Sequence, residues 1–241
     1  ATSFVFDFRQ NPGGLLDQAL KISNMFLDDG DVIMQTQEKD AEPNKIVASD
    51  SEFGDFKITE PSVLLVDEGS ASASEIVAGA LQESSEIPLV GTTTFGKGTV
   101  QTVYPLTESS ELKLTVAKWL TPNGNWIHEK GISVDYEVAL PEYATLTIID
   151  STATYEEGTV SEEVKNVEAM LNAIGYAVEA DGYYDEATVE QVASFQAANE
   201  LDATGIVTGD TALAIVEKLR EVLTENDTQY DKAVEILMGN E

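Results

Sequence analysis

The sequence contains no cysteine and only one histidine, His128. The absence of cysteine excludes disulfides, thiolate nucleophiles and cysteine metal sites. Any mechanism that pairs a serine with a histidine would have to use His128. No partner pattern accompanies this residue, so we interpret it as structural. The sequence has neither a His/Cys cluster nor acidic residues at calcium-loop spacing, and it therefore implies no metal and no organic cofactor.

Basic residues are scarce, since 13 Lys and Arg stand against 44 Asp and Glu and give a formal net charge of −31. No acidic tail accounts for this charge, which is spread over the chain. A surface of this sign repels phosphate backbones and anionic headgroups, which disfavours nucleic acids and electrostatic membrane docking. The 241 residues, 42% of them hydrophobic, suffice for one large or two modest domains with buried cores.

Long apolar runs are also missing, as is a basic leader, which predicts no signal peptide or membrane span within this sequence. The chain opens almost at once on the strand-like segment from Phe4 to Phe8. A β-branched and aromatic strand seldom begins a natural chain without a lead-in. We therefore expect this sequence to be a processed or truncated piece of a longer polypeptide.

The order of the apolar segments predicts two domains. Residues 1–145 alternate short apolar runs with helical stretches, a pattern typical of an α/β layer fold. Residues 146–159 have linker composition. Residues 160–222 carry apolar positions at helical spacing around turn-rich stretches, which indicates a small helical module. Residues 223–241 contain a short amphipathic helix that we expect to pack back on the first domain or to form an oligomer contact.

The first candidate site is the segment from Asp7 to Gly14, where a strand runs into a Pro-Gly-Gly turn ahead of a helix near Leu15. Adjacent glycines let backbone N–H groups approach a ligand closely, and a helix start adds partial positive charge. That combination suits an anion or an oxyanion. The alternative is an ordinary strand-to-helix turn.

The second candidate follows the buried strand Val63 to Val66, where a glycine turn leads to a helix. A small nucleophile at that helix start would lie beside free N–H groups that stabilise negative charge. Three serines compete for the role, and each has helix capping as its alternative interpretation. The pattern alone does not choose among them: Ser70, Ser72 and Ser74.

The third candidate is the loop from Gly91 to Gly98, which fits the GxxxxGK pattern of a nucleotide-binding loop. The next residue is Gly98 where Ser or Thr is needed, and a β-rich segment follows where a helix is needed. A nucleotide site is therefore the lowest-ranked interpretation, and absence of ATP binding would exclude it. On a strand, Lys97 and Gln101 would share one face. A lysine in a partly buried cleft can serve as general base to a serine, although an exposed lysine on a strand edge is the commoner case.

In this order, the three segments resemble the C-terminal processing (tail-specific) serine peptidases. The resemblance extends to the segment Lys130–Asp135, where Val134 replaces the usual proline. It implies a crotonase/ClpP-like α/β peptidase core and a Ser-Lys dyad. In that family's pattern the nucleophile is Ser72, the general base is Lys97, and Gln101 orients the lysine amine. The implied oxyanion hole consists of backbone N–H groups of Ala73 and of the turn Gly13-Gly14.

Residues 160–222 resemble a second family, the three-helix peptidoglycan-binding-like domains. The shared positions include Tyr184, Phe195-Gln196 and Thr204–Val207, whereas Glu168 stands where that family often has glutamine. The module would either localise the enzyme in the wall or brace a homo-oligomer, and we favour wall association. A packing module without a ligand is the alternative.

Together, the resemblances imply a serine endopeptidase that processes extracytoplasmic proteins near their C-termini, secreted or held by a membrane anchor, at the bacterial cell wall. Its partners would be proteins or peptides with exposed C-termini. Members of the peptidase family carry an anchor or signal, the first part of the core and a PDZ domain ahead of this region, so the fragment alone could be inactive. The alternative function is a non-catalytic peptidoglycan-binding scaffold.

Overall fold

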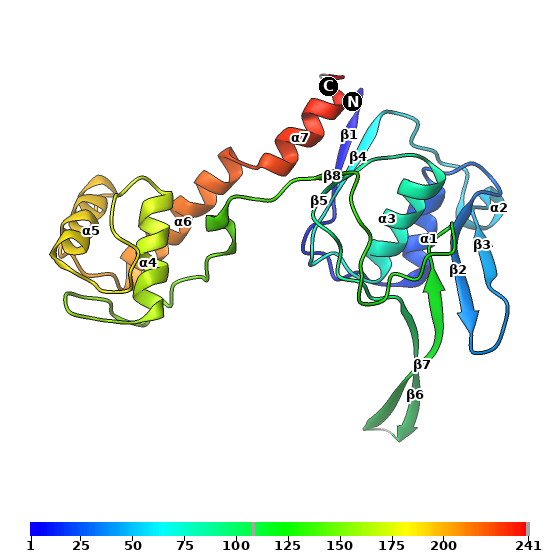
Figure 1. Ribbon diagram of the computed structural model, residues 1–241, viewed down its shortest axis with the longest axis horizontal. Coiled ribbons are helices and arrows are strands. Elements are labelled where there is room, and N and C mark those ends of the chain that lie inside the picture. The colour runs from blue at the N-terminus through cyan, green and yellow to red at the C-terminus, as the bar shows by residue number, and fades with distance from the viewer. Residues whose placement is uncertain (108, 240–241) are drawn as a thin grey trace. The chain divides into compact units, whose positions relative to one another are not determined.

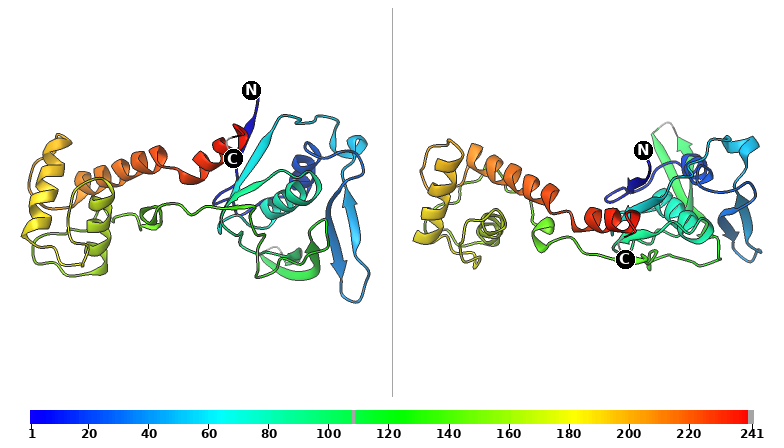
Figure 2. Two further views of the ribbon diagram at one scale, coloured as in Figure 1. Left: turned by 45° about the horizontal axis from the view of Figure 1, so that its top comes forward. Right: turned by 90° about the horizontal axis from the view of Figure 1, so that it is seen from above.

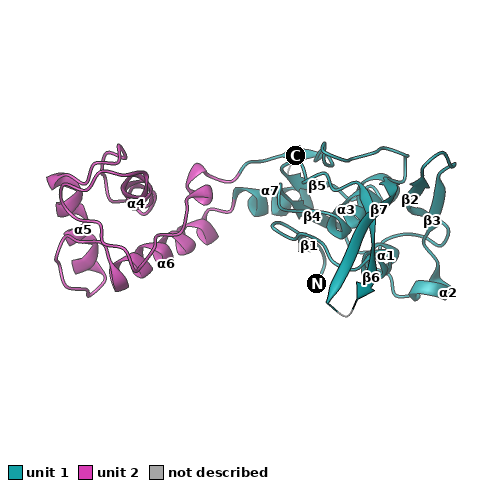
Figure 3. Ribbon diagram, turned by 90° about the horizontal axis from the view of Figure 1, so that it is seen from below, with its two compact units in different colours: residues 1–139, 228–241 teal, residues 140–227 magenta. Residues whose placement is uncertain are grey.

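The computed structural model describes residues 1–107 and 109–239 (Figure 1). The chain divides into two compact units, Ala1–Ala139 with Thr228–Glu241 and Leu140–Asp227 (Figure 3). The first is a mixed α/β unit and the second is mainly helical, so the predicted fold class is confirmed. None of the helices in the described residues is long and apolar enough to cross a membrane.

The first unit contains two four-stranded sheets. Strands β1, β4, β5 and β8 form a parallel sheet in that order, and strands β3, β2, β7 and β6 form an antiparallel one. The bounds of its elements are β1 Phe4–Asp7, α1 Leu16–Asn24, β2 Val32–Glu38, β3 Asn44–Val47, α2 Asp50–Phe53, β4 Ser62–Val66, α3 Ala73–Ser84, β5 Leu89–Gly91, β6 Thr99–Thr107, β7 Ser110–Leu120, β8 Tyr136–Glu137 and α7 Thr228–Leu237.

Strand β4 lies at the centre of the parallel sheet and is buried on both faces. Leu64 and Val66 belong to a core that also contains residues of α1, α3 and β2, and the two helices lie between the sheets (Figures 1 and 2). The alternate residues Val63 and Leu65 pack with Ala233 of α7. The run Val63–Val66 is apolar without alternation, which is typical of a parallel strand covered on both faces.

Helix α7 belongs to the first unit although it comes last in the chain. Its Gln229 is buried, donates from Nε2 to the Val138 carbonyl at 2.8 Å and accepts from Arg9 Nη1 at 3.1 Å. These polar contacts orient the helix, and its apolar face covers the sheet next to β4. The terminal helix is therefore a packing element of the α/β unit.

The second unit contains η1 Glu142–Thr145, α4 Glu162–Ala173, α5 Glu186–Ala198 and α6 Gly209–Glu225. Its core extends into the segment whose composition indicates a linker, because Ile149 and Tyr155 are both buried in it. Tyr155 pairs with Val207 through a β-bridge. That pairing joins residues far apart in sequence, which composition alone does not reveal.

Buried polar side chains connect the loops of the second unit. Gln196 Nε2 donates to the Ile206 carbonyl at 3.0 Å, and Gln196 Oε1 accepts from Gly205 N–H at 2.8 Å. Glu168 accepts from Gly182 N–H at 2.9 Å and from Thr188 Oγ1 at 3.3 Å. Burial raises the pKa of Glu168 above its ordinary value, and these hydrogen bonds act in the opposite direction. Several residues that carry the second resemblance thus stabilise the fold from inside.

Candidate active site

Ser72 occupies the turn between β4 and α3 in an unusual backbone conformation. Its φ is 58° and its ψ is −115°, a region that residues with a Cβ rarely adopt. Its side chain is partly exposed, whereas Ser70 and Ser74 are 0% and 3% exposed. Ser70 Oγ donates to the Phe8 carbonyl at 2.8 Å, which gives it a structural role. Ser72 is therefore the accessible serine of the three.

The Pro-Gly-Gly turn lies directly against Ser72. A Cβ placed on Gly13, whose φ is +96°, would be 2.5 Å from the Ala71 carbonyl oxygen and 2.7 Å from the Ala73 nitrogen. Only glycine fits this approach. Gly13 N–H donates to Asn11 Oδ1 at 3.0 Å, so that donor is occupied. Within the described residues, the N–H groups of Gly14 and Ala73 have no acceptor, and they are the available donors beside Ser72.

A cavity of about 250 Å³ opens beside these donors. Gly14 and Ala73 both line it, and the rest of its wall is mainly apolar. The lining residues are Phe8, Asn11, Gly13, Gly14, Leu15, Gln18, Ala19, Ile22, Ala73, Ser74 and Val77. The arrangement can bind a small apolar group next to two backbone donors.

Lys97 comes from a different loop and reaches the same place. Its backbone N–H donates to Glu75 Oε2 at 2.8 Å, and Ser72 N–H donates to that same oxygen at 2.8 Å. The backbone nitrogens of Ser72 and Lys97 are therefore close together, because each lies 2.8 Å from the same oxygen atom. The Lys97 residue is half-buried, and no hydrogen bond joins Lys97 Nζ to Ser72 Oγ among the described residues.

Gln101 does not share one face of a strand with Lys97, contrary to what the sequence pattern predicts. Lys97 precedes β6, and the pairing of β6 with β7 shifts register between Val100 and Gln101. Because a bulge interrupts the alternation of side chains, period two does not relate residue 97 to residue 101. Gln101 is exposed, and its Nε2 lies 3.5 Å from Thr115 Oγ1. A strand, β6, follows the Lys97 loop, whereas a nucleotide-binding loop would be followed by a helix.

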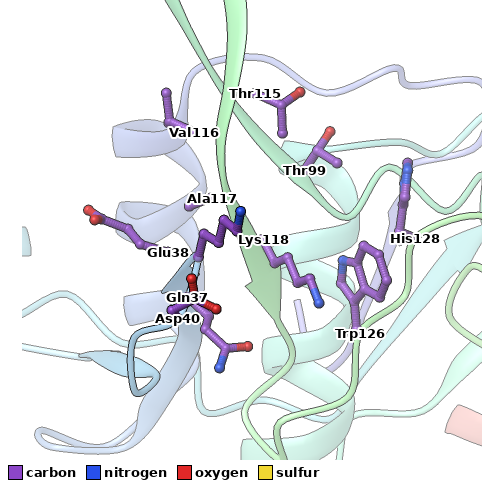
Figure 4. Close-up of a pocket in the computed structure, with 11 residues that line it drawn as sticks. Gln37, Glu38, Asp40, Thr99, Thr115, Val116, Ala117, Lys118, Trp126 and His128 are labelled. Carbon is purple, nitrogen blue, oxygen red and sulfur yellow. The ribbon is translucent and has the colours of Figure 1, made fainter.

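A second cavity, of about 610 Å³, is lined by Lys118, Trp126 and His128 among other residues (Figure 4). Lys118 points toward the ring of Trp126, with Nζ 4.1 Å from the ring centroid. The His128 and Trp126 rings are tilted by 35° with their centroids 5.3 Å apart, and His128 Nδ1 is 3.3 Å from the Gly96 carbonyl oxygen. His128 thus contacts the backbone of the loop that carries Lys97.

Sequence reasoning did not single out Glu75. Its position three residues after Ser72 matches the capping-box spacing, and its side chain does accept from Ser72 N–H. The same carboxylate also accepts from Gly96 and Lys97. The capping pattern could have indicated the first contact, whereas the contacts across 21 and 22 residues depend on the tertiary fold.

Comparison with known proteins identifies the class to which this fold and site belong. The family model of peptidase family S41 matches residues 1–138, and the chain belongs to that family. The model of the peptidoglycan binding domain family matches residues 160–215. Both resemblances seen in the sequence are thereby confirmed.

Relatives within the family match almost the whole chain. The carboxy-terminal processing protease CtpA of Bacillus subtilis (strain 168) is 46% identical over 98% of this chain and 50% of its own length. A probable CtpA-like serine protease of Staphylococcus aureus (strain N315) is 40% identical over 97% of this chain and 47% of its own length. The chain therefore spans about half the length of the curated relatives it matches.

Among solved structures, the photosystem II D1 C-terminal processing protease aligns with a TM-score of 0.52 and 34% identity. The alignment covers 58% of this chain and 36% of that one. This solved structure matches the mixed α/β core of the chain.

Proposed function

We propose that this chain contains the catalytic centre of a serine endopeptidase that cleaves extracytoplasmic proteins near their C-termini. Ser72 is the nucleophile, Lys97 is the general base, and Gln101 orients the lysine amine. The observation that carries the proposal is the shared acceptor Glu75 Oε2, which holds the backbone N–H groups of Ser72 and Lys97 on one atom. Membership of the S41 family and the names of the relatives support it.

The chemistry proceeds through an acyl-enzyme. Neutral Lys97 Nζ takes the proton of Ser72 Oγ while Oγ bonds to the carbonyl carbon of the substrate. The N–H groups of Ala73 and of the Gly13-Gly14 turn stabilise the oxyanion, with Gly14 as the donor left unoccupied in this structure. The lysine returns its proton to the leaving amine as the peptide bond breaks. Water then attacks the Ser72 ester and regenerates the free hydroxyl.

The cavity beside the donors supports a preference at the scissile bond. Its volume of about 250 Å³ and its apolar wall, which includes Leu15, Ile22 and Val77, suit a small apolar side chain next to the attacked carbonyl. A charged substrate side chain would lose its hydration there without a partner of opposite charge.

The direct test is labelling with a fluorophosphonate probe, using the whole protein that contains this chain. Wild-type protein is expected to label on Ser72, and the Ser72→Ala and Lys97→Ala variants are expected to remain unlabelled. Labelling that survives in Lys97→Ala would contradict the dyad.

The helical unit supports an accompanying proposal, association with peptidoglycan at the cell wall. The match over residues 160–215 carries it, and the names of the relatives are compatible with an extracytoplasmic enzyme. Sedimentation with insoluble wall material tests it. If the protein sediments with the wall, and Ser72→Ala leaves every functional assay unchanged, the chain is a non-catalytic scaffold instead.

A further inference from the structure

Glu75 is a buried acid beside the proposed dyad that takes no part in the bond-forming and proton-transfer steps above. We propose that it is a positioning residue that fixes Lys97 against Ser72, a role that rests on the proposed function. The side chain lies in the first turn of α3 and is 0% exposed. No lysine or arginine forms an ion pair with it among the described residues. The groups that contact the Glu75 carboxylate are hydrogen-bond donors.

Four donors meet the Glu75 carboxylate. Oε2 accepts from Ser72 N–H and from Lys97 N–H, each at 2.8 Å. Oε1 accepts from Gly96 N–H at 2.6 Å and from Thr94 Oγ1 at 2.7 Å. Hydrogen bonds to an ionised acceptor are shorter and stronger than those between neutral groups. One oxygen therefore holds both residues of the dyad, and the other holds the loop that leads to Lys97.

The opposite edge of the same loop is held by the only two tryptophans in the sequence. Trp119 Nε1 donates to the Lys97 carbonyl at 2.7 Å, and Trp126 Nε1 donates to the Gly98 carbonyl at 2.9 Å. Figure 4 shows Trp126 among the residues that line the second cavity. We call Glu75, Trp119 and Trp126 the lysine cradle. Because it holds the N–H and the C=O of Lys97 at once, the lysine backbone is fixed before substrate arrives.

Replacement of Glu75 by glutamine removes an acceptor without a change in size. If the new NH₂ takes the place of Oε1, it faces Gly96 N–H. If it takes the place of Oε2, it faces the N–H groups of both Ser72 and Lys97. Either orientation sets donor against donor and leaves a buried N–H unpaired. The loop must then move, and Lys97 moves with it.

The test compares three variants of the whole protein by the rate and affinity of fluorophosphonate labelling at several pH values. Glu75→Gln breaks the anchor. Trp119→Phe removes the Nε1–H donor and keeps an aromatic ring in the core. Glu168→Gln is the matched control, because it makes the same substitution at a buried glutamate of the second unit, which the catalytic proposal does not involve. Thermal unfolding of each sample establishes that it is folded at the assay temperature.

We expect Glu75→Gln to lower the maximal labelling rate by about a hundredfold, as a shift of about 1 Å in a catalytic group does. The probe concentration at half-maximal rate should stay near the wild-type value, because the cradle does not contact the probe. Trp119→Phe should lower the rate by about tenfold, the effect of one hydrogen bond. Glu168→Gln should label like wild type.

Three results separate the possible failures. If wild-type protein labels on Ser72 and folded Glu75→Gln labels at the same rate, the positioning role is wrong and the dyad stands. If Glu75→Gln does not fold, Trp119→Phe decides, and a wild-type rate in that variant overturns the role. If wild-type protein does not label on Ser72, the proposed function fails, and the positioning role fails with it.

Discussion

The contact between Gly13 and the serine turn makes Gly13→Ala the most informative single substitution. The new Cβ would lie 2.7 Å from the Ala73 nitrogen and 3.1 Å from Ser72 Cβ, while the backbone keeps a φ of +96° that alanine disfavours. The strain should lower the free energy of unfolding of the first unit by about 1–3 kcal/mol. The methyl group also covers the Ala73 N–H, and loss of one oxyanion donor lowers the rate by about a hundredfold to a thousandfold.

Gly14→Ala is the matched control. No atom lies within 4 Å of the Cβ position of Gly14, and its backbone is outside the positive-φ region. The substitution keeps the Gly14 N–H, so the free energy of unfolding should change by less than about 0.5 kcal/mol. The two variants are compared by fluorophosphonate labelling, by peptide hydrolysis and by denaturant unfolding. A Gly13→Ala variant that labels as fast as Gly14→Ala would refute the proposed geometry of the oxyanion hole.

Three further predictions concern other residues. Ser72→Gly should abolish labelling yet raise the free energy of unfolding by about 1 kcal/mol in denaturant titrations, because glycine relieves the strained φ of 58°. Gln101→Ala should lower the labelling rate with an unchanged melting temperature, since Gln101 is exposed and has one long contact; an unchanged rate would remove it from the site. Burial raises the pKa of Glu168 above 4.5, so the stability linked to this group is present in acid and is lost as pH rises through the raised value. Glu168→Gln should therefore melt higher than wild type at pH 7 and should lose that advantage below about pH 4.

The sequence was sufficient to predict the α/β core and the helical module, because their signals are local. The apolar run Val63–Val66 and the helix expected near Leu15 correspond to β4 and α1. The sequence pattern alone could not identify which of the three serines is the proposed nucleophile. The choice depends on the strained φ of Ser72 and on the burial of Ser70 and Ser74, which only the fold determines.

Other features of the site depend on contacts distant in sequence. The cradle joins Glu75 to Lys97 and Lys97 to Trp119, each across 22 residues, and no local spacing predicts such pairs. The bulge after Val100 changes which face Gln101 occupies, and a simple alternation of strand residues does not anticipate it. Composition likewise does not reveal that Ile149 and Tyr155 belong to the core of the second unit.

Activation of Ser72 by Lys97 is best tested by fluorophosphonate labelling of the whole protein, with the modified residue located by mass spectrometry in wild type, Ser72→Ala and Lys97→Ala. We expect one labelled residue, Ser72, in wild type and none in either variant. Labelling of another serine, or equal labelling of wild type and Lys97→Ala, would show that Lys97 does not activate Ser72.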